Sequence, residues 1–471
     1  MDRIREVFRT RKLGSTAPVE YTPLEGEVGD LDGDVDAAYD PPSMTSSTVL
    51  LSPRTNRAFA DSQPISLFDY VVFLVLGVAM LWAWNCFLAA AAYFQMRFRN
   101  NKAILDTFQS SIMTVSTATT LILTLTLSHM QRSAHYPYRI TCALVINMVV
   151  FILLALSTIL FTDISAGVYL AFTLLMVLGT AVSAGFFQNG LLSYVAGFAP
   201  IYSQAMMSGQ GVAGVLPAIA QMISVLAIPP KSHESQDDKA ATASPKSAFV
   251  YFLAATVVSG VALLFFTIHL NRHNDKNHSN HPVADGLAES DALPPKKNLS
   301  LWQLLKKLPL TGYTVFFTFA LTMVFPVFTQ ATFSVNSSPS SVFSRPDVFI
   351  PFSFLVWNSG DLIGRVVCGF PRIACTNPTI LAMASTARLV YIPLYFLCNI
   401  KGGGAKVNSD FFYELVQFTF GLTNGYVGSN AIMLAPRLVS EDESQAAGGF
   451  MGLCLVAGLA AGSVSSFLLR V

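Results

Sequence analysis

Long apolar runs alternate with shorter polar segments along most of the chain. A helix that crosses about 30 Å of hydrocarbon needs roughly 20 mostly apolar residues. Windows of this kind lie near residues 67–91, 103–128, 140–161, 166–198, 200–228, 247–269, 310–334, 348–370, 377–399, 410–435 and 446–469. These runs are continuous, whereas the strands of a membrane barrel would alternate in polarity over about 10 residues. The pattern therefore predicts an all-α polytopic membrane protein with eleven transmembrane helices.

Two polar stretches divide this series of windows. Residues 1–65 are acidic in part and rich in Gly and Pro, and such a segment cannot bury enough apolar surface to fold. They are therefore predicted to form a disordered tail. Residues 270–300 are predicted to form a central loop between transmembrane helices 1–6 (66–269) and helices 7–11 (301–471). A long loop between two helical sets is typical of a two-bundle transporter.

Composition and charge agree with a membrane protein. Of the 471 residues, 52% are apolar and 12% are charged, about half of the roughly 25% charged residues in soluble domains. The net charge of +1 gives no field that would attract a nucleic acid polymer. Lys and Arg are most numerous in the tail and around the central loop, so the positive-inside rule places both in the cytosol. An odd number of spans then puts the C-terminus on the opposite side.

Residue types that form catalytic or metal sites are poorly placed in this sequence. The six cysteines lie in or beside apolar runs and form no CxxC, which indicates reduced structural thiols. His273, His278 and His281 fall in the predicted central loop, where solvated histidines are favoured over a metal site. The sequence contains no HExxH, nucleophile elbow or phosphate loop placed for catalysis. It therefore predicts neither an enzyme nor a bound cofactor or metal.

One glycine motif matches the dinucleotide pattern GxGxxG, at Gly209, Gly211 and Gly214 in "MSGQGVAG". It lies in an apolar run with no preceding strand, so it lacks the context of a dinucleotide site. Small residues in a membrane helix allow close helix packing, which is the function predicted here, with Gln210 as a polar contact.

The segment "WNSGDLIGR" carries charge inside an otherwise apolar window. Asn358, Asp361 and Arg365 are spaced three and four residues apart, so they share one face of a helix. A charge at the bilayer centre costs several kcal/mol and marks a functional site by default. The segment is therefore predicted to be part of a binding site, with a structural ion pair between helices as the alternative.

Polar groups also lie inside two other predicted spans. The middle of the first predicted span contains Trp82, Trp84 and Asn85. These residues are predicted either to form a cavity wall or to pack against other helices. Gln188 and Asn189 lie in the fourth, and buried amides need hydrogen-bond partners. They are predicted either to contact a ligand or to join helices.

The chain resembles the equilibrative nucleoside transporter family in several of its predicted spans. The resemblance is carried by "WNCFLAAAAYF" in the first predicted span, "AMMSGQGVAG" in the fifth, "WNSGDLIGR" in the eighth, "ARLVYIPLYFLCNI" in the ninth and "GYVGSNAIMLAP" in the tenth. It covers about residues 66–471. It implies a fold like the major facilitators, and facilitative alternating access for nucleosides or nucleobases. A plasma membrane and a vacuolar or other internal membrane both fit this expectation.

The resemblance also implies how a nucleobase would be held. Leu81, Trp84 and Leu88 would line its pocket, and Gln188 would form a hydrogen bond with it. The chain departs from the family pattern at Ala83, where the family commonly has Pro. This difference affects the shape of the implied pocket.

The ribose and the apolar walls are implied in the same way. Asn358, Asp361 and Arg365 would bind the ribose, while Phe325 and Leu459 would form apolar walls. Pro326 predicts an interruption of the seventh helix after Phe325, because proline cannot donate a backbone hydrogen bond.

Two other functions are open from the residues. One is a proton-coupled carrier of another neutral or cationic solute, with Asp361 as the coupling carboxylate. The other is a receptor or scaffold without transport, but a scaffold does not need polar residues in the middle of its spans.

A second departure from the family pattern, besides Ala83, is Trp357, which stands where the family commonly has Phe. This difference affects the substrate range.

Overall fold

The computed structural model describes residues 65–131, 134–161, 164–227, 245–279, 299–336 and 342–466. Almost all of these residues are helical, so the predicted all-α fold is confirmed. Nearly all of the predicted tail, and the central loop from residue 280 to residue 298, lie outside the described residues. The division into domains that was drawn from these two segments stays a prediction.

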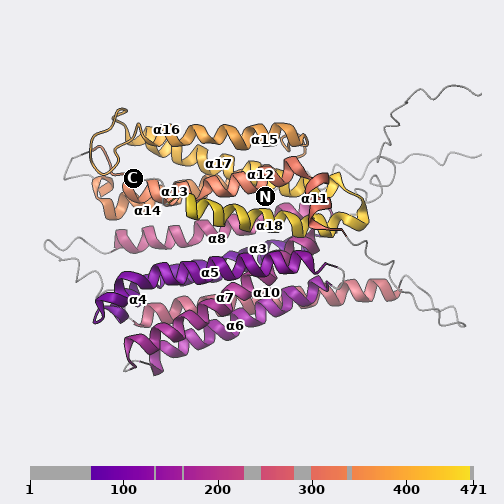
Figure 1. The fold of residues 1–471 in the computed structure, drawn as a ribbon, viewed down its shortest axis with the longest axis horizontal. Coiled ribbons are helices and arrows are strands. Elements are labelled where there is room, and N and C mark those ends of the chain that lie inside the picture. The colour runs from indigo at the N-terminus through magenta and orange to yellow at the C-terminus, as the bar shows by residue number, and fades with distance from the viewer. Residues whose placement is uncertain are drawn as a thin grey trace, which may run out of the picture. The chain divides into compact units, whose positions relative to one another are not determined.

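The first bundle consists of α3 to α10. Its helices are α3 (Leu67–Ala89), α4 (Ala91–Phe98), α5 (Lys102–His129), α6 (Tyr136–Leu160), α7 (Ala166–Val195), α8 (Pro200–Ala227) and α10 (Pro245–Ser279). Helix α3 packs against α8 and α10, and α7 packs against α5 and α6. The first bundle occupies the indigo-to-magenta half of Figure 1.

The second bundle consists of α11 to α18. Its helices are α11 (Leu301–Lys307), α12 (Pro309–Thr322), α13 (Val324–Ala331), η1 (Val342–Ser344), α14 (Pro346–Val367), α15 (Pro378–Ala387), η2 (Arg388–Val390), α16 (Tyr391–Tyr395), α17 (Asp410–Leu434), η3 (Ala435–Leu438) and α18 (Glu441–Ser466). The closest pairs are α14 with α17 and α12 with α18. Figure 1 shows α4 and α11 at opposite ends of the helices, which we call the α4 end and the α11 end.

Eight helical segments in the described part of the chain are long and apolar enough to cross a membrane. They begin at Leu67, Lys102, Tyr136, Ala166, Pro200, Pro245, Pro309 and Glu441. Helices α14 and α17 have 22 and 25 residues, so length does not exclude them. We attribute their absence from the eight to the polar side chains that they carry, among them Asp361 and Asn424. The total of eleven spans stays a prediction.

The helices begin and break where the local chemistry requires it. Asn101 caps α5 by accepting a hydrogen bond from the backbone N–H of Ile104, and Ser300 forms a capping box at α11. Pro326 cannot donate to the carbonyl four residues earlier, at Thr322. Helix α12 ends at Thr322 and α13 begins at Val324. The interruption therefore lies at Met323, before Phe325 and not after it as predicted, and Pro326 stands inside α13.

Helix α10 differs from the sequence expectation. It continues to Ser279, although residues from 270 onward were predicted to be loop. Residues 270–279 contain no Gly or Pro, so nothing in them stops a helix that leaves the apolar layer. His273 therefore has a fixed place on a helix and is not a loop histidine.

Glycines allow α14 and α17 to touch along their backbones. A Cβ built at Gly421 would lie 2.1 Å from the carbonyl oxygen of Trp357, and one at Gly425 would lie 2.0 Å from that of Asp361. These distances leave no space for any other residue. The charged segment of α14 is thus held directly against α17.

Candidate functional site

A cavity of about 430 Å³ lies between the two bundles. This volume falls in the range of about 300–1,000 Å³ that is typical of small-molecule sites. The first bundle contributes residues of α3, α5, α6, α7 and α8, and the second contributes residues of α12, α14, α17 and α18. Most of these residues lie near the middle of their helices, so the cavity is buried deep between the bundles.

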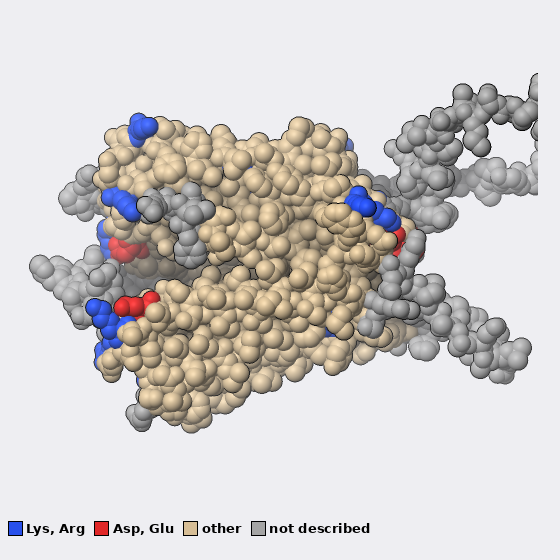
Figure 2. Space-filling view, in the orientation of Figure 1, with Lys and Arg blue, Asp and Glu red and all other residues tan. Residues whose placement is uncertain are grey.

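The cavity is closed toward the α11 end. There α8 meets α14, since Gln204 Nε2 donates to the carbonyl oxygen of Arg365 at 3.4 Å. Likewise α7 meets α18, because a Cβ at Gly448 would lie 2.2 Å from the carbonyl oxygen of Leu192. Figure 2 shows a hollow between the two halves at the opposite, α4 end, and charged residues gather at the two ends with an uncharged band between them. The two bundles therefore enclose a central cavity that opens at one end.

The predicted charge pair lies on the wall of this cavity and is held by several hydrogen bonds. Arg365 Nε donates to Asp361 Oδ2 at 2.7 Å, and Asn424 Nδ2 donates to Asp361 Oδ1 at 2.8 Å. Arg365 Nη1 donates to Gln210 Oε1 at 2.9 Å and to the carbonyl oxygen of Met207 at 3.3 Å. Asp361 and Arg365 are each only 5% exposed. Their mutual contacts offset the cost of burying two charges.

The same network reaches a second buried arginine. Arg388 Nη2 donates to Asn424 Oδ1 at 3.0 Å, and its Nη1 donates to the carbonyl oxygen of Thr318 at 2.9 Å. Thr322 Oγ1 also donates to Asn424 Oδ1, at 2.6 Å. Asn424 therefore connects Arg388 to Asp361. We call Gln210, Asp361, Arg365, Arg388 and Asn424 the polar network.

Neither Arg388 nor Asn424 was predicted to belong to the site. Arg388 could have been found from the sequence, since a lone Arg inside an apolar window needs a buried partner. No sequence pattern indicates Asn424, because its role depends on two residues from other helices. Gln210 was predicted as a polar contact between helices, and it makes one to Arg365.

The first bundle supplies the other walls of the cavity. The Trp84 ring stacks on Phe87 with their planes 8° apart, and both residues line the cavity. Asn85, also on the wall, is fixed by donating to the carbonyl oxygen of Ala213 at 2.7 Å. Gln188 Nε2 is buried and has no hydrogen-bond partner among the described residues. It is a donor that a ligand in the cavity can use.

Seven of the nine predicted site residues line the cavity. They are Leu81, Trp84, Gln188, Asn358, Asp361, Arg365 and Leu459. Phe325 does not line it: its ring stacks on Trp357 at a centroid distance of 4.1 Å, and Trp357 forms the wall. The side chain of Leu88 lies outside the described residues.

Residues 174–471 match the family model of nucleoside transporters. The chain belongs to the nucleoside transporter family. This confirms the resemblance found in the sequence, and the family is one of transporters, not of enzymes. The match, together with the long apolar helices, also establishes a multi-pass integral membrane protein.

Individual relatives cover most of the chain. It is 28% identical over 446 residues to the nucleoside transporter FUN26 of Saccharomyces cerevisiae, with 85% of this chain and 83% of that protein covered. It is 25% identical over 457 residues to the equilibrative nucleoside transporter 1 of Homo sapiens, with 85% and 96% covered.

Solved structures give the fold. The fucose:proton symporter FucP of E. coli aligns with a TM-score of 0.55 at 10% identity, covering 85% of this chain and 92% of that chain. A bacterial homologue of the iron transporter ferroportin, in an outward-facing state, aligns with a TM-score of 0.54 at 11% identity, covering 86% and 93%. FucP is a major facilitator superfamily transporter, so the predicted major-facilitator-like fold is confirmed.

Proposed function

We propose that the protein carries nucleosides across a membrane by facilitative alternating access, and binds them in the cavity between the bundles. The observation that carries this proposal is the buried pair of Asp361 and Arg365 on one wall, with aromatic rings and an amide on others. A nucleoside is uncharged, with hydroxyls on its sugar and a flat polar base. The two parts need different partners, and the cavity offers both.

The polar network can accept a ribose without losing its own hydrogen bonds. Each oxygen of the Asp361 carboxylate accepts one hydrogen bond from the described residues and has capacity for another, from a sugar hydroxyl. Arg365 Nη2 makes no hydrogen bond to the described residues, so it remains as a donor. We therefore assign the ribose to Asp361 and Arg365, with Asn358 beside them.

The base is assigned to the walls formed by α3 and α7, with Leu459 of α18 in the second bundle. Trp84 offers a flat face, Leu81 and Leu459 offer apolar surface, and Gln188 offers an amide. A nucleobase has the same combination of a π-face and polar edges.

We expect Gln188→Ala to weaken uptake of some nucleosides more than others. A lost hydrogen bond costs about 1 kcal/mol or more where the base supplied the partner, and little where it did not. The ratio of uridine to adenosine uptake should therefore change by about fivefold, measured by competition in one preparation. An equal loss for purines and pyrimidines would show that Gln188 joins helices and does not contact the base.

Arg365 connects the binding site to the closed end of the cavity. Its Nε holds Asp361, while its Nη1 reaches Gln210 and Met207 on α8, in the other bundle. A ligand that draws the guanidinium toward its hydroxyls competes with these contacts to α8. In this mechanism substrate binding loosens the closure at the α11 end, and the bundles then rock to open that end.

A facilitative mechanism fits Asp361 better than proton coupling does. Both oxygens of Asp361 accept hydrogen bonds from N–H donors, one of them cationic, so the described contacts use this carboxylate as an acceptor. A proton-coupled carrier of another neutral or cationic solute would need this carboxyl to gain and lose a proton in each cycle.

Uptake of labelled uridine and adenosine into vesicles that contain the purified protein tests the function. We expect uptake of at least one of them without a pH gradient, and no uptake into empty vesicles. Absence of uptake for both would contradict nucleoside transport. Uptake that needs a pH gradient would favour the proton-coupled alternative.

The orientation in the membrane is part of the proposal. We place the N-terminal tail and central loop in the cytosol and the C-terminus on the other side, in a plasma membrane or an internal membrane. The α11 end then faces the cytosol, because α10 ends and α11 begins at that end, on either side of the central loop (Figure 1). The cavity accordingly opens away from the cytosol.

Any glycan on the chain should therefore map to Asn336 and never to Asn277 or Asn298. The sequon Asn336-Ser337-Ser338 follows α13, which ends at the α4 end (Figure 1), whereas Asn277 and Asn298, which also begin sequons, belong to the predicted central loop (270–300). Peptide mapping after glycosidase treatment in H₂¹⁸O locates the modified Asn. Sugar at Asn277 or Asn298 would invert the orientation.

A further inference from the structure

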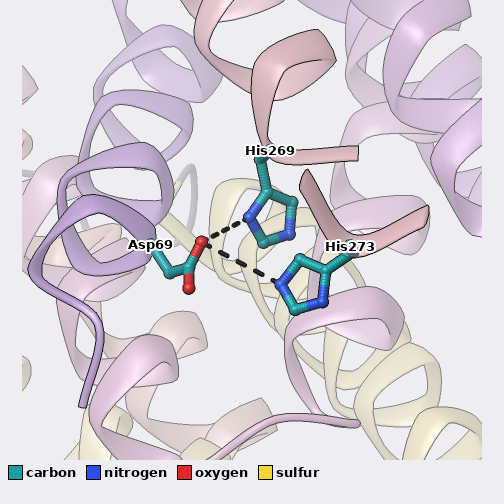
Figure 3. A group of neighbouring side chains, drawn as sticks. All are labelled: Asp69, His269 and His273. Atoms are coloured by element: carbon teal, nitrogen blue, oxygen red, sulfur yellow. Dashed lines mark hydrogen bonds and ion pairs between the residues drawn. The ribbon is translucent and has the colours of Figure 1, made fainter. Parts of the chain in front are cut away.

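Three metal-ligating side chains meet at the α11 end of the first bundle. Asp69 lies in the first turn of α3, and His269 and His273 lie near the end of α10. His269 Nδ1 is 2.7 Å from Asp69 Oδ1, and His273 Nε2 is 4.0 Å from the same oxygen. Figure 3 shows both imidazole rings turned toward the carboxylate. None of the three residues lines the substrate cavity.

The helix places the two histidines in a metal-binding register. They are four residues apart, so they project from the same face of α10, as the paired histidines of helical zinc sites do. Their ring centroids are 4.5 Å apart. Because α3 and α10 pack along one another, Asp69 adds a third ligand from a different helix.

We propose that Asp69, His269 and His273 bind one divalent transition-metal ion, with Zn²⁺ as the best match. Two imidazoles and one carboxylate suit Zn²⁺, whereas Mg²⁺ and Ca²⁺ prefer sites made of oxygen alone. The ligand atoms all lie within 4.8 Å of one another. Zinc ligands at about 2.0–2.2 Å from the ion lie within roughly 4 Å of one another, so a small rotation of His273 completes the site. Water takes the fourth position.

Burial favours an ordered site with one route of access. The His269 side chain is fully buried and that of Asp69 is 12% exposed, while that of His273 is 37% exposed. An ion can therefore enter past His273, whose exposed ring has room to rotate. Arg272 does not neutralise Asp69 in the described structure, because its guanidinium lies over the Phe68 ring at 4.1 Å.

A hydrogen bond to a residue that is not itself a proposed ligand favours metal binding by His269. Its Nε2 lies 3.1 Å from the hydroxyl oxygen of Tyr194. A metal at Nδ1 requires the hydrogen of the neutral imidazole to be on Nε2, and the Tyr194 oxygen can accept it there. Metal-bound histidines regularly donate their second ring N–H in this way.

The proposed ion would lie next to the closure between the bundles. Tyr70, the residue after Asp69, donates from its hydroxyl to Gln204 Oε1 at 3.1 Å. Gln204 in turn donates to the carbonyl oxygen of Arg365 in the second bundle. An ion held by Asp69 would fix the turn of α3 that carries Tyr70, and so support the closed α11 end.

Direct metal binding tests the proposal without using transport. The full-length protein, purified without a polyhistidine tag and stripped with a chelator, is dialysed against micromolar Zn²⁺ and analysed for zinc per chain. We expect about one Zn²⁺ per chain. Mutation of a residue that only hydrogen-bonds to a ligand typically weakens metal binding by about 10- to 100-fold. Competition with a chromophoric chelator should show a larger loss of zinc affinity for His273→Ala and for Asp69→Asn. Tyr194→Phe should weaken it within that range.

Matched variants exclude other histidines as the ligands. His129→Ala removes an exposed histidine from α5 at the same end of the bundle, and should leave binding unchanged. The double variant His278→Ala/His281→Ala should also leave it unchanged. Each protein must elute as a single peak in size-exclusion chromatography, and His273→Gln serves as a second variant if His273→Ala aggregates. Stoichiometric zinc that survives His273→Ala and Asp69→Asn, zinc that is lost with His278 and His281, or no bound zinc in the wild type would each overturn the proposal.

Discussion

Asp361→Asn is expected to lower nucleoside uptake by about 100-fold or more while the protein still reaches the membrane. The amide keeps the shape of the side chain, but it removes a negative charge from a buried site and leaves Arg365 without its counter-ion. Breaking a buried pair in this way costs about 3–5 kcal/mol. It also removes a strong acceptor from the proposed ribose site. Uptake of labelled uridine and adenosine, normalised to surface-labelled protein, measures the effect.

Asp106→Asn is the matched control, because it makes the same chemical change at an exposed position on α5. Its uptake should equal that of the wild type. Near-normal uptake by Asp361→Asn would show that the carboxylate does not bind the ribose.

Removing both charges separates folding from substrate binding. In Asp361→Leu/Arg365→Met neither charge is left alone in the protein, and replacing a buried pair by apolar residues is often neutral or stabilising. We expect the thermal stability to be closer to that of the wild type than in Asp361→Asn, with uptake still absent. Recovered uptake in the double variant would assign the pair a purely structural role.

The sequence predicts the helices of this fold better than it predicts their contacts. Long apolar windows are a local property, and eight of the eleven contain a helix of the described chain that is long and apolar enough to cross a membrane. The window 377–399 is instead divided among α15, η2 and α16. The face shared by Asp361 and Arg365 is also local, since it depends only on helix periodicity. The 2.7 Å contact within that pair could therefore be expected from spacing alone.

Contacts between distant helices could not be read from spacing. Asn424 joins Arg388 to Asp361, and each of the three comes from a different helix. Phe325 was placed on the cavity wall, but the neighbouring helix puts Trp357 in front of it. In both cases the outcome depends on the relative rotation of packed helices, which no single segment determines.

Polar composition led to the error at His273. A run of polar residues after an apolar window indicates the end of a membrane span, but it does not indicate the end of a helix. Helix α10 continues for ten residues beyond the predicted boundary, to Ser279, and so brings His273 to Asp69.

Gly425→Ala is expected to disrupt the second bundle. Its Cβ would lie 2.0 Å from the carbonyl oxygen of Asp361 and 3.0 Å from the backbone nitrogen of Arg365. These are backbone atoms, so they can move away only if α14 separates from α17. Overpacking costs about 1–3 kcal/mol and occasionally more, and the shift would also displace the Asp361 carboxylate. We expect a large fall in the melting temperature measured by size-exclusion chromatography of heated samples, with uptake lost.

Gly167→Ala is the control that separates the predicted clash between α14 and α17 from the general effect of replacing a helical Gly by Ala. Gly167 also lies in a helix, α7, but a Cβ there would meet nothing within 4 Å. Alanine favours a helix by about 1 kcal/mol over glycine, so this variant should be as stable as the wild type or slightly more so, with normal uptake. Equal melting temperatures for Gly425→Ala and Gly167→Ala would contradict the close packing of α14 on α17. That packing is what holds Asp361 and Arg365 at the cavity wall, because both residues lie on the stretch of α14 whose backbone Gly425 touches.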